Sequence, residues 1–80
     1  MELKGKLLIL KCFGETILLT LEQGTKRFLV IVYRKKIGIK AFATLRDLQK
    51  GSLITLEGSP QTTKSGKIII RMNLLLSPLS

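Results

Sequence analysis

The stretch TILLTLEQGTKRFLVIVYR, residues 16–34, contains two apolar runs joined by a glycine turn. In the first run, Ile17, Leu19 and Leu21 are expected to face the core, and Thr16, Leu18, Thr20 and Glu22 are expected to face outward. Thr25–Arg34 is rich in β-branched and aromatic side chains. Both patterns are typical of β-strands, and Gln23–Gly24 predicts a tight hairpin between them. Thr25–Arg34 has no polar face, so we expect it to be buried on both sides or to contact another protein.

A strand precedes this hairpin and a helix follows it. Lys4–Phe13 is another short apolar run, so three strands open the chain. From Ile39 onward the apolar residues are spaced as in a helix, at Ala41, Leu45 and Leu48. Thr44 with Asp47 predicts a capping box, and Gly51 predicts the helix C-terminus.

Two further strands are predicted at Ser52–Gly58 and Lys67–Leu76, joined by a polar loop over Ser59–Gly66. In the last strand one face is expected to be core, formed by Ile68, Ile70, Met72, Leu74 and Leu76. The opposite face is basic and amide-bearing, formed by Lys67, Ile69, Arg71, Asn73 and Leu75. The chain is therefore predicted to be a single all-β domain over residues 1–80, with one short helix and a short tail at 77–80.

The net charge of +9 and the pI of about 10.2 predict a polyanionic partner, with nucleic acid first and an anionic membrane surface second. The chain has no histidine and a single cysteine, Cys12, which excludes an internal disulfide and a zinc site built from both residue types. We expect Cys12 to be a small core residue, and we expect no cofactor. The longest N-terminal apolar run, Leu7–Leu10, is too short for a signal peptide or a membrane span. A reducing, cytoplasmic location is expected, or a nucleoid or organellar one.

Three strands, one helix and two strands is the element order of the OB-fold, a five-stranded Greek-key barrel that binds oligonucleotides and oligosaccharides. The segment Leu48–Thr62, LQKGSLITLEGSPQT, closely resembles the stretch L-x-K-G-S-x-V-x-V-E-G-x-L-Q-T of bacterial single-stranded DNA-binding proteins. Phe28–Lys35, FLVIVYRK, is similar to that family's third strand, which ends in a base-stacking aromatic residue before a basic pair. The primosomal PriB proteins are compatible relatives. Unlike the family, the chain has short loops and no acidic residue after Glu57.

The resemblance places Tyr33 at the base-stacking position, with a tyrosine of the core as the alternative. Phe42 is a weaker stacking candidate, Phe13 is ambiguous, and Phe28 is expected in the core. Basic candidates for phosphate contacts form two groups, and a solvated lysine surface is the alternative reading for both. These groups are Arg34, Lys35, Lys36 and Lys40, and Lys64, Lys67 and Arg71.

These features predict a protein that binds single-stranded DNA with little sequence preference and supports replication, repair or replication restart. Its apolar strands favour a homodimer or homotetramer. The alternatives are a protein-interaction subunit of a replication or transcription complex and a single-stranded RNA-binding module, which uses the same stacking and phosphate contacts. No enzymatic activity is expected, because five scattered carboxylates without histidine or a glycine-rich phosphate loop do not assemble a catalytic site.

Overall fold

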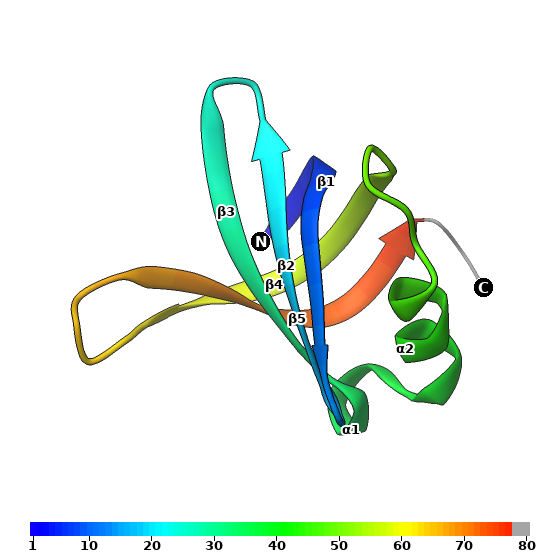
Figure 1. The fold of residues 1–80 in the computed structure, drawn as a ribbon. Coiled ribbons are helices and arrows are strands. Elements are labelled where there is room, and N and C mark those ends of the chain that lie inside the picture. Colours follow the sequence, from blue (N-terminus) through cyan, green and yellow to red (C-terminus); the bar gives the residue numbers. More distant parts are fainter. Residues whose placement is uncertain (78–80) are drawn as a thin grey trace.

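The computed structural model describes residues 1–77, which form one closed five-stranded barrel with two short helices at one end (Figure 1). The barrel order is β1-β2-β3-β5-β4, and the helices lie between β3 and β4. The strands are β1 (Glu2–Phe13), β2 (Thr16–Gln23), β3 (Lys26–Tyr33), β4 (Leu53–Thr62) and β5 (Ile68–Ser77). This topology confirms the predicted OB-fold.

Both hairpins of the opening meander turn on two residues, and glycine comes first in each turn. Phe13 pairs with Thr16 around Gly14, and Gln23 pairs with Lys26 around Gly24. Both glycines have φ near +60°, which suits the first central position of a two-residue hairpin loop. The second turn is therefore Gly24–Thr25, one residue later than the sequence predicted.

The barrel closes through pairings between distant segments. β1 pairs antiparallel with β4, and β3 pairs in parallel with β5 at Val30–Ile70 and Ile31–Arg71. Closure brings backbones very close at Gly58 of β4. A Cβ at this position would lie 2.6 Å from Cγ2 of Ile70 and 2.7 Å from the carbonyl oxygen of Arg71. Only glycine fits there without a shift of the neighbouring strand.

Alternating side chains of all five strands fill the barrel. The alternation of β2 is confirmed, since Ile17, Leu19 and Leu21 are fully buried. Within residues 1–77 the buried cluster consists of Leu3, Leu7, Ile17, Leu19, Leu21, Val30, Val32, Phe42, Leu45, Ile54, Leu56, Ile70, Met72 and Leu75. Burial of an aliphatic side chain of this size contributes about 1.5–3 kcal/mol, so this core is the main source of stability.

The helical region differs from its prediction at both ends. α1 (Arg34–Ile37) immediately follows β3, where the sequence predicted no helix, and α2 (Ile39–Arg46) stops before Leu48. Gly38, with φ of +92°, separates the two helices. The backbone therefore changes direction at Gly38, and α2 continues across the end of the barrel.

The predicted capping box is wrong. Thr44 lies inside α2, where its Oγ1 donates a hydrogen bond to the carbonyl oxygen of Lys40 at 3.0 Å, and the residue that precedes α2 is Gly38. Gly51 is no helix cap either, because it lies in a later turn with φ of +93°. Its N–H donates to the carbonyl oxygen of Leu7 at 2.8 Å, which ties this turn to β1.

The last two strands depart from the predicted loop and from the predicted faces. β4 continues through Pro60 to Thr62, so only residues 63–67 form the connection to β5. In β5 the pairing shifts between Met72 and Leu74, and Leu74 is exposed while Leu75 is buried. The core face predicted for Ile68–Leu76 is thus correct at Ile70 and Met72. It is wrong at Leu74, because one extra residue reverses the alternation. It is also wrong at Ile68, which is exposed because it lies at the turn end of β5, opposite Thr62 and outside the core.

Three smaller expectations are settled by the described residues. Cys12 is exposed near the end of β1, so the prediction of a core cysteine is wrong. Of the tail predicted at 77–80, Ser77 ends β5 and the other positions lie outside the described residues. Neither helix within residues 1–77 has the length and hydropathy needed to cross a membrane.

Candidate nucleic-acid interface

One outer face of the barrel, formed by the second half of β1 with β2, β3 and the middle of β5, is apolar, aromatic and basic. We call it the aromatic–basic face. Its residues are Ile9, Lys11, Phe13, Thr16, Leu18, Thr20, Leu29, Ile31, Tyr33 and Arg71. The outward side of β3 is thus solvent-exposed or half-buried in this chain, which removes burial on both sides as the explanation for its apolar pattern.

Two exposed rings stand at one end of this face. Thr16 of β2 pairs with Phe13 of β1 and with Tyr33 of β3, so the three residues form one row across the sheet. Phe13 is 58% exposed and Tyr33 is 40% exposed. Two strand spacings put the two backbones about 9–10 Å apart. Both rings therefore offer a free face on the same side of the barrel.

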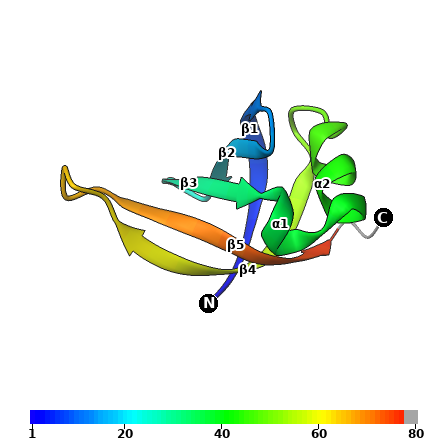
Figure 2. The same cartoon turned by 90° about the horizontal axis from the view of Figure 1, so that it is seen from below.

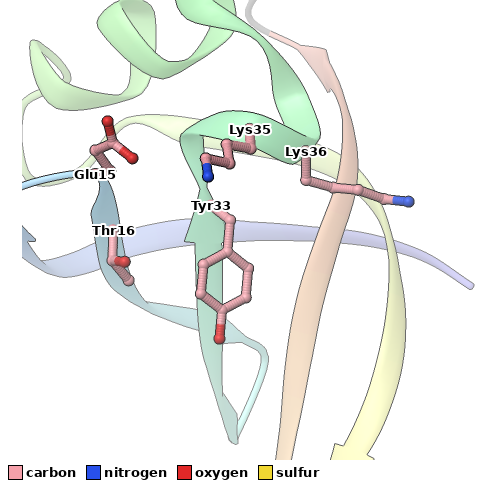
Figure 3. Close-up of a pocket in the computed structure, with 5 residues that line it drawn as sticks. All are labelled: Glu15, Thr16, Tyr33, Lys35 and Lys36. Atoms are coloured by element: carbon pink, nitrogen blue, oxygen red, sulfur yellow. The ribbon is translucent and has the colours of Figure 1, made fainter.

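A depression of about 450 Å³ adjoins this row, within the range of about 300–1,000 Å³ that is usual for small-ligand pockets. Figure 3 shows Glu15 and Thr16 on one side of it and the Tyr33 ring on the other, with Lys35 and Lys36 above. The Lys35 side chain extends toward Glu15, and the Lys36 side chain extends away from it (Figure 3). The depression combines an aromatic ring, two ammonium groups and one carboxylate.

The turn between β1 and β2 is held against α1 by two contacts between the same residues. The N–H of Arg34 donates to the carbonyl oxygen of Glu15 at 3.0 Å, and Nη1 of Arg34 lies 3.8 Å from Oε1 of Glu15. Both side chains are about half exposed, so the ion pair adds little stability, and the backbone bond fixes the position of Glu15. Arg34 is thereby partly neutralised, whereas no ion pair involves Lys35 or Lys36 within residues 1–77.

Arg71 lies on β5 at the border of the aromatic–basic face, beside Ile31 of β3 and opposite Ser59 of β4. Its Nε is buried and has no hydrogen-bond partner among the described residues. Nearby, Nδ2 of Asn73 donates to Oγ of Ser59 at 2.8 Å, while Oδ1 of Asn73 is likewise buried and unpartnered in residues 1–77. Arg71 thus keeps one unused hydrogen-bond donor and Asn73 one unused acceptor beside the apolar residues of this face.

The remaining basic candidates lie elsewhere. Lys64 and Lys67 belong to the turn of an arm formed by β4 and β5, which projects from the barrel away from α1 in both ribbon views (Figure 1, Figure 2). The arm turn is closed by the N–H of Thr63, which donates to the carbonyl oxygen of Lys67 at 2.8 Å. Lys40 is exposed on α2. The structure therefore gathers Tyr33, Arg34, Lys35 and Lys36, and it spreads the other basic residues.

Phe42 is removed from the stacking candidates. It is 5% exposed and lies on the inner side of α2, where its ring belongs to the core cluster. Phe28 also packs against this cluster, as predicted. The reason is positional, because a helix laid across the open end of a barrel buries the residues that face the barrel.

Sequence reasoning missed several residues that the structure places at the interface. Phe13 was left ambiguous, and Lys11, Glu15 and Thr16 were not considered as site residues. The available signal was the pairing around the Gly14 turn, because a two-residue hairpin puts Phe13 directly opposite Thr16 on one face. A register drawn from both glycine turns would have aligned Phe13, Thr16 and Tyr33.

Within residues 1–77, no group of three histidine, cysteine or carboxylate residues is close enough to hold a metal ion.

No protein-family model and no curated protein sequence matches this chain. Among solved structures it is similar to asparaginyl-tRNA synthetase from Pyrococcus horikoshii, both in a crystal structure complexed with asparaginyl-adenylate and in a second crystal structure. The TM-scores are 0.86 and 0.85, the sequence identities are 19% and 18%, and 94% and 100% of this chain is covered. The chain spans only 18% and 20% of the synthetase chains. This likeness supports the barrel fold, and the resemblance to single-stranded DNA-binding proteins stays a hypothesis.

Proposed function

We propose that this chain binds single-stranded nucleic acid on the aromatic–basic face, with RNA as the preferred ligand, and that it does so without catalysing a reaction. One observation carries the proposal: Phe13 and Tyr33 stand exposed on either side of Thr16, next to the ammonium groups of Lys35 and Lys36. Single-strand binding needs these two elements together, since bases stack on aromatic rings and phosphates pair with cations.

The dimensions of the face fit a short strand. Lys67, in the turn just before β5, lies four residues before Arg71, and Tyr33 lies two residues beyond the partner of Arg71, Ile31. At about 3.3 Å per residue these steps make a path about 20 Å long from the arm to the depression. Such a path suits the lower part of the range of about 4–16 nucleotides that one OB-fold covers.

The choice of RNA rests on two considerations. The solved structures reported above belong to an enzyme named for its action on tRNA, and their barrel is of the same kind. Single-stranded loops with unstacked bases are the part of RNA that proteins read with aromatic side chains. This chain offers two such rings on an accessible face.

DNA binding in replication, repair or replication restart is the second candidate, and the segment Leu48–Thr62 favours it. However, three residues of this segment already have tasks in the fold. Gly51 and Ser52 are bonded to the backbone of Leu7, and Gly58 permits the close approach of β5. Because the resemblance is explained in part by closure of the barrel, it says less about the ligand than the exposed rings do.

A protein-interaction role is favoured by a different observation, the exposed apolar residues on several surfaces. These are Ile9, Leu29, Ile39, Leu53, Ile68 and Leu74, besides the aromatic residues. Apolar surface of this kind also suits self-association into a dimer or tetramer, in which several copies of the chain would bind the same nucleic-acid strand.

The test is a titration of fluorescently labelled 12-nucleotide oligo-rU and oligo-dU with the protein, at low and moderate salt, followed by fluorescence anisotropy. The two ligands differ only in the 2′-hydroxyl group, so their ratio measures RNA preference directly. We expect tighter binding of oligo-rU, a salt slope of about −0.7 per neutralised phosphate, and poor competition by duplex. Equal affinity for oligo-rU and oligo-dU would contradict the RNA preference and favour the DNA candidate or a protein that binds both kinds of single strand. No binding of either oligomer would favour the protein-interaction role.

A further inference from the structure

Glu15 is the one acidic residue among residues 1–77 that lines the depression, and the position of its backbone is fixed. Its carbonyl oxygen accepts a hydrogen bond from the N–H of Arg34 at 3.0 Å, and it lies in the tight turn after Gly14. A carboxylate beside a phosphate-binding surface weakens phosphate contacts by repulsion. The chain nevertheless carries it on the same side of the depression as Thr16, across from the Lys35 side chain (Figure 3).

We propose that the depression holds a single nucleobase and that Glu15 selects a base that presents an amino group, cytosine over uracil among the pyrimidines. The inference rests on the proposed function and deepens it, because it turns a surface that tolerates any sequence into one with a preference. Tyr33 stacks on the base, the Glu15 carboxylate lies at its edge, and Lys35 and Lys36 hold the flanking phosphates.

Cytosine and uracil differ in the hydrogen-bonding group that they would present to the Glu15 carboxylate. An ionised carboxylate only accepts hydrogen bonds. Cytosine offers its N4 amino group as a donor, whereas uracil, like thymine, offers the O4 carbonyl oxygen at the same place. A uracil in the depression would therefore bring two acceptors face to face, and a cytosine would form a charge-assisted bond.

The ion pair with Arg34 leaves the Glu15 carboxylate able to accept further hydrogen bonds. Its Nη1–Oε1 distance of 3.8 Å is longer than a direct hydrogen bond, and the Glu15 side chain is 59% exposed. The carboxylate thus retains lone pairs for a ligand. Arg34 in turn keeps the carboxylate near the depression and offsets part of its repulsion of phosphate.

The experiment compares labelled 9-nucleotide oligo-rC and oligo-rU by fluorescence anisotropy, with wild-type protein, Glu15→Gln and Glu22→Gln. In a homopolymer every register puts the same base into the depression, so the affinity ratio reports on that base alone. Glu22 is a matched control, since it lies on β2, the strand that follows Glu15, and pairs with Arg27 at the other end of that strand. Both variants raise the net charge by one unit.

We expect wild-type protein to prefer oligo-rC about three- to tenfold, the net effect of one ordinary hydrogen bond, because the Glu15 side chain is more than half exposed. Glu15→Gln should reduce this ratio of affinities to near one and raise the affinity for oligo-rU. Glu22→Gln should raise the affinity for both oligomers and leave their ratio unchanged. Equal affinities in wild-type protein, or a ratio that survives Glu15→Gln, would overturn the inference and leave the proposed function intact. Failure of wild-type protein to bind either oligomer would overturn the proposed function itself.

Discussion

Strand β1 supplies side chains to two outer faces of the barrel that differ in chemistry. Its second half belongs to the aromatic–basic face. Its first half pairs with β4 in what we call the mixed-charge face, which consists of Glu2, Lys4, Lys6, Leu53, Thr55 and Glu57. Two acids and two lysines balance there, and the exposed apolar residue Leu53 has no aromatic neighbour in the pairing.

The difference shows why net charge alone does not locate a binding surface. Lysines occur on both faces, but only the aromatic–basic face combines rings with cations that lack acidic partners. The change happens within one strand, because an irregularity between Leu7 and Ile9 shifts the pairing with β2 by one residue. Even-numbered residues of β1 face outward before the shift, and odd-numbered residues face outward after it.

The largest expected effect comes from removing the two rings. Phe13→Ala with Tyr33→Ala should weaken binding of a 12-nucleotide oligo-rU by about 30-fold or more, because each stacked base contributes about 1–3 kcal/mol. Fluorescence anisotropy measures this loss. The matched control is Leu53→Ala with Leu74→Ala, which removes two exposed apolar side chains elsewhere. If the control variant lost as much affinity as the ring variant, the two faces would be equivalent and the comparison would fail.

The next effect concerns the fold that holds the two faces apart. Gly58→Ala should lower the free energy of unfolding by about 1–3 kcal/mol, because the new Cβ would collide with Ile70 and with the backbone of Arg71. Urea denaturation followed by circular dichroism measures it, with Thr62→Ala on the exposed side of β4 as control. Unchanged stability together with weaker nucleic-acid binding would mean that the resembled segment serves the ligand instead of the barrel.

A pair of double charge reversals tests the cations directly. Lys35→Glu with Lys36→Glu and Lys4→Glu with Lys6→Glu give proteins of equal net charge, with the change on different surfaces. The first should weaken oligo-rU binding about tenfold at moderate salt and reduce the salt slope by about 1.4, the value for two phosphates on a single strand. The second should leave the slope unchanged. Equal slopes for both variants would assign the charge effect to the general field of the protein.

The smallest expected effect is on the ion pair beside the depression. Arg34→Met should change the free energy of unfolding by less than about 0.5 kcal/mol, since both partners are about half exposed. Thermal unfolding at low and high salt measures it. A larger loss that vanishes at high salt would show that the pair, and not the backbone bond between the same residues, fixes the turn at Glu15.

The parts of the fold that could be predicted depend on local patterns. The hairpins follow from glycine between alternating runs, and Ile17, Leu19 and Leu21 show their buried face in the sequence itself. The misses involve features without a local signature. The reversal of faces after Met72 depends on how β5 meets β4, and the burial of Phe42 depends on where α2 lies over the barrel.

The candidate site divides in the same way. Tyr33, Lys35 and Lys36 were found because an aromatic residue followed by basic residues is visible along the chain. Phe13 and Glu15 join them through cross-strand pairing, which places residues 20 positions apart in sequence on one surface. Adjacency of this kind follows from register, and the register is fixed only when both turns are placed correctly.

The parallel pairing of β3 with β5 is short and joins residues 40 positions apart, and the pairing of Glu2 with Glu57 spans 55 positions. Such distant pairings are slow to form, because chain entropy must be lost before their contacts contribute. Every residue lining the depression lies between positions 15 and 36, within the locally connected part of the chain. During folding the stacking row is therefore expected to form early, and Arg71 completes the surface only in the final step of closure.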